Sequence, residues 1–331
     1  MENPRISVII TAYNGGKFID KAIRSVLGQT FRNLELIVVD DSSSDDTVDI
    51  VKGFALKDER VRLFVLDKNS GGPGFPRTVG VKKSQGAYFA FLDQDDAFMP
   101  GNLETKLKIF DEPGNENILI VNGYSWTVDN KTGKLVDYWP YSPINWLVKK
   151  KFLEDGGYFK SEQDGVDELG LWFRAMKKHD PKKSEYFVTE PQTLYFRHEG
   201  QNSSALHIHA EPQKFIERLT ALAADAGGDD RFRNDLSRIL SRLGNFYCLA
   251  GDAGQGRRVF SESLRLRKNF FSALFYSFSF LPHGDYEFLA DFLKNTQSCT
   301  IWKIRLMKAK FKYEISYGEA ERFLKKGKAY P

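Results

Sequence analysis

The stretch "ISVIITAYNGGKFIDKAIRSVLGQTFRNLELIVVDD" (residues 6–41) decides the fold of this chain. It opens with a β-branched apolar run over 6–13 and continues into 15–30, where apolar residues recur at helical spacing. A second apolar run follows over 34–41. Continuously apolar strands that alternate with helices are typical of a parallel sheet covered by helices on both faces. The stretch therefore predicts an α/β fold.

The alternation of strands and helices continues through the first hundred residues. We predict a helix within 42–56, because polar capping residues precede its apolar positions, and a third strand over 61–66. A short helix is predicted over 75–86, where Gly86 ends it, and a fourth strand over 87–92. This order favours a Rossmann-like, mainly parallel sheet.

The pattern after the fourth strand is mixed and then becomes helical. Strands are predicted over 117–126 and 193–199, with a helix over 167–179 between them. We expect an α/β domain over 1–208 and a helical C-terminal domain over 209–331.

Three features of the predicted helical domain bear on its role. Residues 243–266 resemble a tetratricopeptide-like helical hairpin, with an ordinary helical bundle as the alternative. The basic segment 300–315 carries aromatic side chains, so it either contacts an anionic membrane surface or packs its apolar side on the bundle. Acceptor binding and homodimer formation are two further roles for this region.

The composition narrows the class of protein. Among 331 residues the formal net charge is +4, too small to indicate a nucleic-acid partner. Two cysteines do not make a disulfide framework, the N-terminus lacks the parts of a signal peptide, and no apolar run has the length of a spanning helix. These observations predict a cytoplasmic protein, either free or peripheral at the inner face of the membrane.

Polar clusters follow three of the predicted strands, at residues 11–14, 40–46 and 93–96. Ligands of open parallel sheets bind beyond the carboxyl ends of the strands. Asp93 and Asp95 are two residues apart, so on an extended segment both side chains would point the same way. Hard oxygen ligands suit Mg²⁺ or Mn²⁺ shared with substrate phosphates. The simpler alternative is a solvated loop with aspartates that cap the next helix.

Three classes of protein place an aspartate pair after a parallel strand. In haloacid-dehalogenase-like phosphatases the pair normally ends the first strand, whereas here it ends the fourth. Nucleotidyltransferases usually carry a Gly-rich, basic signature after the first strand, and "TAYNGGKF" (residues 11–18) is a poor match. The third class, nucleotide-sugar glycosyltransferases, fits best.

Four blocks in order, residues 6–47, 77–104, 156–179 and 194–204, resemble family 2 glycosyltransferases of GT-A fold. The resemblance implies an inverting transferase that moves a sugar from a nucleotide-diphosphate sugar, with UDP or GDP as the nucleotide. The acceptor would be a hydroxyl of a glycan or lipid-linked glycan in bacterial cell-surface polysaccharide or lipopolysaccharide assembly. A non-catalytic nucleotide-sugar-binding or scaffold protein and a sugar nucleotidyltransferase remain as alternatives.

The resemblance also implies a donor site. It assigns the nucleotide sugar to Thr11, Ala12, Tyr13, Asn14, Asp40, Asp41, Arg77, Asp93 and Gln94. Within this set Asp41 would contact the base, with Asp40 as a second candidate, and Arg77 would approach the base or the diphosphate. Mn²⁺ or Mg²⁺ would be held by Asp93, Asp95 and His198. The alternative for Arg77 is a surface arginine without a role in the site. The alternative for His198 is a histidine with a structural role.

The catalytic base would come from an acidic pair four residues before a tryptophan. The family has Glu-Asp there, whereas this chain has the reverse order, Asp167 and then Glu168, before Trp172. Position favours Glu168 and residue type favours Asp167, and we prefer Asp167 for its type, with Asp164 as a third candidate. Acids at a helix N-terminus are also stabilised by the helix dipole without any catalytic role.

Overall fold

The computed structural model describes most of the first 197 residues and a smaller part of the rest. The described residues are 4–129, 133, 135–140, 142–160, 167–197, 217, 233, 237, 240, 241, 244, 248 and 252–266. Those up to 197 belong to one compact unit and those from 217 onward to another. The predicted boundary at 208 lies outside the described residues.

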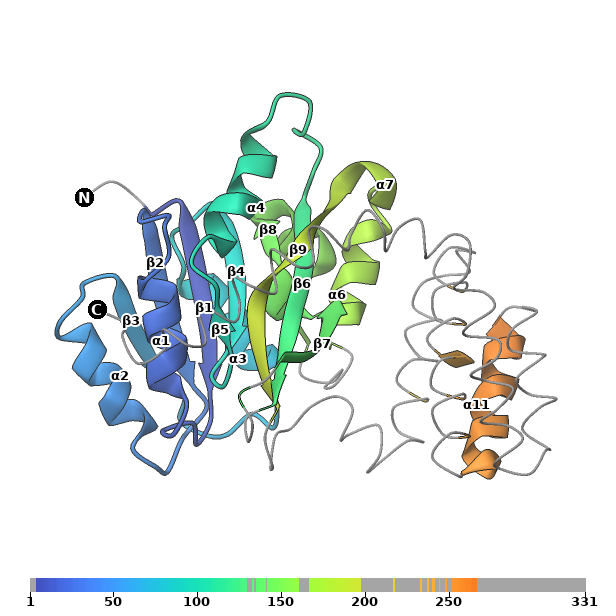
Figure 1. Ribbon diagram of the computed structural model, residues 1–331, viewed down its shortest axis with the longest axis horizontal. Helices are drawn as coiled ribbons and strands as arrows, with labels where there is room; N and C mark the ends of the chain where they lie inside the picture. The colour runs from blue at the N-terminus through green and yellow to red at the C-terminus, as the bar shows by residue number, and fades with distance from the viewer. Residues whose placement is uncertain are drawn as a thin grey trace. The chain divides into compact units, whose positions relative to one another are not determined.

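The described strands form one sheet of nine strands in the order β3-β2-β1-β4-β8-β6-β9-β5, with β7 paired to β6 (Figure 1). The strands are β1 (Ile6–Ala12), β2 (Leu34–Asp40), β3 (Val61–Val65), β4 (Tyr88–Asp93), β5 (Ala97–Phe98), β6 (Ile120–Asp129), β7 (Leu135–Pro140), β8 (Leu147–Lys149) and β9 (Glu185–Arg197). The helices of this unit are α1 (Ile19–Leu27), α2 (Thr47–Ala55), α3 (Gly74–Lys83), α4 (Asn102–Asp111), the 3-10 turn η1 (Pro143–Asn145), α5 (Lys150–Gly156), α6 (Asp167–Met176) and α7 (Pro181–Ser184).

The first four strands are parallel, which confirms the prediction from residues 6–92. The other half of the sheet is mixed: β8 is antiparallel to β4 and to β6, while β9 is parallel to β6 and antiparallel to β5. The strand order reverses direction between β1 and β4, because the chain moves outward to β3 and then returns. In open α/β sheets this reversal is where ligands bind.

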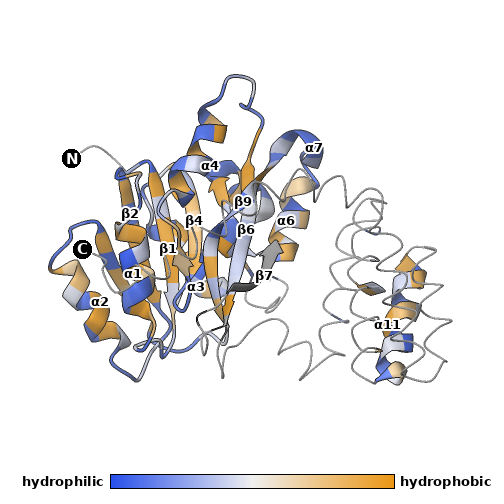
Figure 2. Cartoon of the chain, viewed as in Figure 1, coloured by the Kyte–Doolittle hydropathy of each residue, from blue (hydrophilic) through white to orange (hydrophobic). Residues whose placement is uncertain are grey.

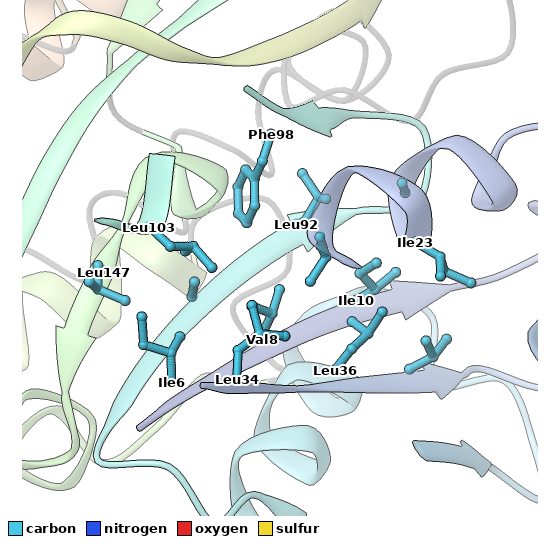
Figure 3. Packing of buried hydrophobic residues seen from close by; sticks show 14 of the residues in the cluster. Ile6, Val8, Ile10, Ile23, Leu34, Leu36, Leu92, Phe98, Leu103 and Leu147 are labelled. Atoms are coloured by element: carbon cyan, nitrogen blue, oxygen red, sulfur yellow. The ribbon is translucent and has the colours of Figure 1, made fainter. Parts of the chain in front are cut away.

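The core on one face of the sheet is built from alternate residues of the parallel strands. Ile6, Val8 and Ile10 of β1 are fully buried and pack with Leu36 of β2 and Ile23 of α1 (Figure 3). Burying each such side chain contributes roughly 1.5–3 kcal/mol. Figure 2 shows the strands β1, β2 and β4 as mostly hydrophobic, while α1 and α2 carry both hydrophobic and hydrophilic residues.

The opposite face of the sheet is covered by α3, which approaches the strands closely. A Cβ atom at Gly80 would lie 2.5 Å from Ile9 Cγ2, so a side chain there would push the helix away. Helix α3 ends at Lys83, and Ser84 is extended, so the prediction that Gly86 ends the helix was wrong. Gly86 instead lies against β1, where its amide donates to Ser7 Oγ at 2.9 Å.

The later elements are confirmed with shifted ends. Helix α6 begins at the predicted residue, and β6 lies three residues further along than predicted. Strand β9 begins at Glu185, eight residues before the predicted start, because the polar residues and proline at 189–192 separate its first apolar residues, 186–188, from the predicted run. The short strands β5, β7 and β8 and helix α5 were not predicted.

The described residues of the second unit, apart from residue 252, are helical. Helix α11 (Ala253–Leu266) lies within the predicted hairpin and buries Val259 and Phe260. Ser237 Oγ and Ser263 Oγ lie 2.9 Å apart, which links α11 to an earlier helical residue. The rest of the predicted helical domain, including 300–315, lies outside the described residues. None of the helices in the described ranges has the length and apolar character needed to cross a membrane.

Candidate active site

Three strand ends meet at the reversal point of the sheet. Thr11, near the end of β1, pairs with Asp93 of β4, and Ala12 pairs with Asp40 of β2. The Ala12 carbonyl accepts a hydrogen bond from the Asp41 amide at 2.7 Å. The residues predicted to bind the nucleotide therefore share one edge with the predicted metal ligand Asp93 (Figure 1).

The loop after β1 is fixed from both neighbouring strand ends. The Tyr13 amide donates to Gln94 Oε1 at 2.8 Å, and Gln94 Nε2 donates to the Tyr13 carbonyl at 3.0 Å. On the other side Asn14, with a left-handed φ of 48°, accepts from the Ser44 amide at 2.8 Å. The Tyr13 side chain is half exposed, so an aromatic face is available at a backbone that is held firmly.

Asp40 and Asp41 are both buried and both accept hydrogen bonds from neutral donors. Asp40 accepts from the Ser43 amide at 2.9 Å and also from the Ser43 hydroxyl. Asp41 accepts from the Ser70 amide at 2.9 Å and from Ser70 Oγ at 2.9 Å. Burial raises the pKa of Asp41, the bonds from Ser70 lower it, and the charge on Asp40 raises it.

Ser70 belongs to the Gly- and Pro-rich loop that leads into α3. Because Asp41 binds Ser70, this loop is attached to the end of β2. Gly71 has a φ of 87°, a conformation that a side chain would strain. Sequence reasoning did not identify Ser70, since its partner Asp41 is 29 residues away.

A turn begins immediately after Asp93 at the end of β4. Residues 94 and 95 form this turn, and the Asp96 amide donates to the Asp93 carbonyl at 3.1 Å. The expectation that Asp93 and Asp95 lie on one extended segment was therefore wrong. Asp93, Gln94 and Asp95 are all partly accessible at this edge.

Asp96 is fully buried behind the turn. Its Oδ1 accepts from the Phe196 amide of β9 at 3.0 Å, and its Oδ2 has no hydrogen-bond partner among the described residues. Burial, together with the charges on Asp95 and Asp93, holds the pKa of Asp96 well above its usual range. The sequence did not single out Asp96, because its partner Phe196 is 100 residues away.

Lys21 of α1 faces the same acids. Its Nζ lies 3.1 Å from the centre of the Phe196 ring. Burial lowers the pKa of Lys21 to about 8, although the charges on Asp96 and Asp95 act in the opposite direction. This lysine was not predicted, and the helical spacing of residues 15–30 gave no sign of it.

Arg77 is buried, with 4% of its surface exposed, and lies between two acids. Its Nη2 donates to Asp93 Oδ1 at 2.9 Å, and its Nη1 lies 3.6 Å from Asp167 Oδ2. The guanidinium also lies 5.5 Å from the centre of the Phe159 ring. The surface-arginine alternative was therefore wrong, and this side chain joins the end of β4 to the start of α6.

The acidic pair opens helix α6. Asp167 is buried and belongs to the ion pair with Arg77, whereas Glu168 is partly accessible. Asp164 and His198 lie outside the described residues. Within the described ranges, His, Cys, Asp and Glu side chains do not gather in threes suited to a metal ion. The described chain thus brings together the predicted nucleotide residues, the Asp93–Asp95 pair and the acidic pair.

Known sequences share this arrangement of motifs. A family model described as Glycosyl transferase family 2 matches residues 7–170. An uncharacterized glycosyltransferase of Rickettsia prowazekii is 35% identical over 269 residues, which is 73% of this chain and 81% of that protein. A Campylobacter jejuni GalNAc(5)-diNAcBac-PP-undecaprenol beta-1,3-glucosyltransferase is 36% identical over 105 residues, or 32% of this chain and 34% of that protein.

Solved structures share the fold. TarS 1-349 of S. aureus in complex with UDP-GlcNAc superposes with a TM-score of 0.61 at 22% identity, over 79% of this chain and 81% of that chain. A Pyrobaculum calidifontis mannosyltransferase in complex with GDP-Man and Mn²⁺ gives a TM-score of 0.51 at 14% identity, over 99% of this chain and 89% of that chain. These two structures support the GT-A-like fold of the first unit.

The family and the two relatives named above are glycosyltransferases by name, and none of them is named as a nucleotidyltransferase or a scaffold protein. The Rickettsia relative covers most of both chains, so its similarity extends well beyond the family motifs. From the residues gathered at the sheet edge and from these matches, the chain is a glycosyltransferase (EC 2.4) and belongs to glycosyl transferase family 2.

Proposed function

We propose that the protein transfers a sugar, with inversion, from a nucleotide-diphosphate sugar to a hydroxyl of a glycan or a lipid-linked glycan. The proposed setting is the assembly of a bacterial cell-surface polysaccharide or lipopolysaccharide. The observation that carries the proposal is the position of Arg77. It contacts Asp93 at the donor edge and lies beside Asp167 of the acidic pair, so donor-side and acceptor-side groups occupy one site.

The proposed donor site lies between the ends of β1, β2 and β4. Tyr13 offers an exposed aromatic face to a base, and the carboxylate of Asp41 accepts hydrogen bonds of the kind that a base N–H donates. This chemistry suits uracil and guanine alike, so UDP and GDP sugars are both candidates. The two solved relatives, which bind UDP-GlcNAc and GDP-Man, span the same two nucleotides.

Mn²⁺ or Mg²⁺ is the proposed cofactor, held by Asp95 and Asp93. The fit rests on their hard carboxylate oxygens, which lie at an accessible edge beside the unpartnered Oδ2 of Asp96. Two protein carboxylates suit an ion that takes its other ligands from a diphosphate and water. His198 stays a prediction as a third ligand. When bound, the metal would stabilise the negative charge of the departing nucleoside diphosphate.

The chain's own residues supply the remaining chemistry. An acid of the Asp167–Glu168 pair would remove the proton of the acceptor hydroxyl as that oxygen attacks the anomeric carbon. Arg77 would keep the Asp93 carboxylate oriented through the hydrogen bond that its Nη2 donates to Asp93 Oδ1. A single displacement of this kind inverts the anomeric carbon.

The acceptor proposal has support from one relative. The Campylobacter enzyme is named for an undecaprenol-linked substrate, although the matched part spans only about a third of that protein. A cytoplasmic location with peripheral membrane contact through 300–315 fits such an acceptor. Acceptor contact or dimer formation through the helical region remain proposals as well.

The test begins with calorimetric titration of UDP and of GDP, each with and without Mn²⁺. We expect one nucleotide to bind tightly only when the metal is present. The donor sugars of that nucleotide are then incubated with the protein, and NMR follows the anomeric form of the sugar that is first released. Absence of metal-dependent binding for both nucleotides contradicts the donor site, and release with retention contradicts the inverting reaction. Release of pyrophosphate from a nucleoside triphosphate would indicate nucleotidyl transfer instead.

A further inference from the structure

Arg77 joins two parts of the site that are far apart in the sequence. Asp93, at the end of β4, is 16 residues from Arg77, whereas Asp167 opens α6 beyond β8 and α5. The shortest contact is the 2.9 Å hydrogen bond to Asp93, and the ion pair with Asp167 spans 3.6 Å. One guanidinium with a planar set of donors can hold both carboxylates in a fixed relation.

The charge of Asp167 lies beside this arginine. The side chains of Arg77 and Asp167 are 5% and 2% exposed, so their ion pair is almost completely removed from water. Burial lowers the pKa of Arg77, but the charges on Asp93, Asp167 and Glu168 outweigh it and keep the pKa above the ordinary value. Removing one member of a buried pair leaves the other charge uncompensated, which is strongly unfavourable.

The packing around Asp167 closes it to a bulky acceptor from the side of α3. A Cβ atom at Gly74 would lie 3.0 Å from Asp167 Oδ2, which is tighter than an ordinary contact, so the start of α3 packs closely against this carboxylate. Thr78 Oγ1 donates to the Phe159 carbonyl at 3.0 Å, which attaches α3 to the segment before α6. Glu168, the next residue, is partly accessible, and its charge also acts on Arg77.

We infer that Asp167 is a positioning residue and that Glu168 is the catalytic base. This inference rests on the proposed transfer reaction. Asp167 holds Arg77, and Arg77 in turn orients Asp93, so the start of α6 is coupled to the donor site. The Glu168 carboxylate takes the hydroxyl proton while the acceptor oxygen bonds to the anomeric carbon. The bond from that carbon to the phosphate oxygen breaks, and its electron pair leaves with the nucleoside diphosphate.

The inference is tested by comparing Asp167→Asn with Glu168→Gln in the full chain. The first readout is UDP and GDP binding in the presence of Mn²⁺. We expect Asp167→Asn to weaken binding about tenfold, because Arg77 loses the charge that holds it in place. Glu168→Gln should leave binding unchanged. This readout does not require turnover.

The second readout is steady-state release of UDP from UDP-GlcNAc or of GDP from GDP-Man, with water as the acceptor. Glu168→Gln should lower kcat by about 100-fold or more at an unchanged KM. Asp167→Asn should mainly raise KM. The reverse pattern, with kcat lost in Asp167→Asn and normal turnover in Glu168→Gln, would overturn the inference. Failure of the unaltered protein to bind either nucleotide would instead contradict the proposed function.

A double variant separates positioning from general damage to the fold. Arg77→Met and Asp167→Asn together remove both members of the pair, so neither charge is left buried without its partner. If Asp167 acts through Arg77, nucleotide binding in the double variant is no weaker than in Arg77→Met alone. Losses that multiply would mean that Asp167 acts independently, and the inference would be rejected. Glu154→Gln, which alters an exposed acid paired with Lys150, is the matched control and should change neither readout.

Discussion

Two acidic clusters lie at neighbouring strand ends, and they meet different partners. The β2 cluster, Asp40 and Asp41, accepts hydrogen bonds from the amides and hydroxyls of Ser43 and Ser70. The β4 cluster, Asp93, Asp95 and Asp96, instead has Arg77 in contact with Asp93 and Lys21 near its other acids. The same residue type therefore has two different roles at one edge of the sheet.

The difference follows from what each partner can do to a carboxylate. Neutral donors from nearby loops fix the shape of a loop without cancelling charge, so we propose that the β2 cluster organises the nucleotide side of the site. The β4 cluster has a cationic partner in Arg77, and Asp96 Oδ2 has no hydrogen-bond partner among the described residues. We therefore propose that negative charge is balanced at this cluster. A divalent ion and a diphosphate are therefore expected to bind at the β4 cluster and not at the hydroxyl-lined β2 cluster.

The largest effect is expected from Asp95→Ala in the β4 cluster. Loss of this carboxylate removes a proposed metal ligand, so Mn²⁺-dependent nucleotide binding should fall by at least about 100-fold. Calorimetric titration with and without Mn²⁺ measures it. Asp49→Ala, on the exposed surface of α2, is the matched control. Unchanged binding in Asp95→Ala would show that the two clusters do not differ in the proposed way.

A smaller effect is expected from Asp96→Ala, this time on stability. The variant leaves the buried Phe196 amide without its acceptor, which costs about 1–3 kcal/mol in the free energy of unfolding. Asp96→Asn retains an oxygen for this hydrogen bond and should lose much less. Urea unfolding of the three proteins measures the difference. Equal losses of unfolding free energy in both variants would mean that the charge of Asp96 stabilises the fold and that its hydrogen bond to Phe196 does not.

Ser70→Ala tests the β2 cluster. The variant removes the hydroxyl that donates to Asp41 Oδ2 and keeps the amide that also binds this carboxylate. One hydrogen bond contributes about 1 kcal/mol, so nucleotide affinity should fall by less than about tenfold. The ratio of affinities with and without metal should not change. Ser84→Ala, at the other end of α3, is the control, and a change in the metal dependence of Ser70→Ala would contradict the division of roles.

The smallest effect is expected from Lys21→Met. The pKa of Lys21 is about 8, so the lysine is charged below that pH and opposes a cation at the β4 cluster. As pH rises through this value, Mg²⁺-dependent nucleotide binding should strengthen by a few-fold, on the order expected for one screened charge. Lys21→Met should bind more tightly at low pH and lack this dependence.

Titrations one unit below and one unit above the pKa of Lys21 compare the variant with the unaltered protein. Lys17→Met, which changes an exposed lysine four residues before Lys21, should keep the normal pH profile. Parallel profiles for Lys21→Met and the unaltered protein would remove Lys21 from the electrostatics of the β4 cluster.

Much of the parallel half of the sheet was predictable from local patterns. The runs over 6–13, 34–41, 61–66 and 87–92 all became strands. Strands β1, β2 and β4 are largely apolar because they are buried on both faces, whereas β3 at the edge is only partly buried. The second half was harder, since β5 and β8 are only two and three residues long and β9 is partly polar. Such strands are held by pairing with distant segments, which local composition does not record.

The candidate site divides in the same way. Residue types and positions at the strand ends, such as Asp41, Asp93 and Asp95, were identified from the sequence and its resemblance to a family. The turn at residues 94 and 95 was not, because it depends on the hydrogen bonds between Gln94 and Tyr13 and between Asp96 and Phe196. Predicting an extended segment ignored these partners.

The amino-acid sequence alone was enough for the fold class of the first unit, the positions of its parallel strands along the chain and the family. Hydrophobic periodicity and motif spacing involve residues that are close together in the sequence, so both can be recognised without coordinates. The folded chain was needed to assign partners to the acids. Ser70 binds Asp41, Arg77 joins Asp93 to Asp167, and these contacts exist only because sheet order and helix packing bring separate segments together.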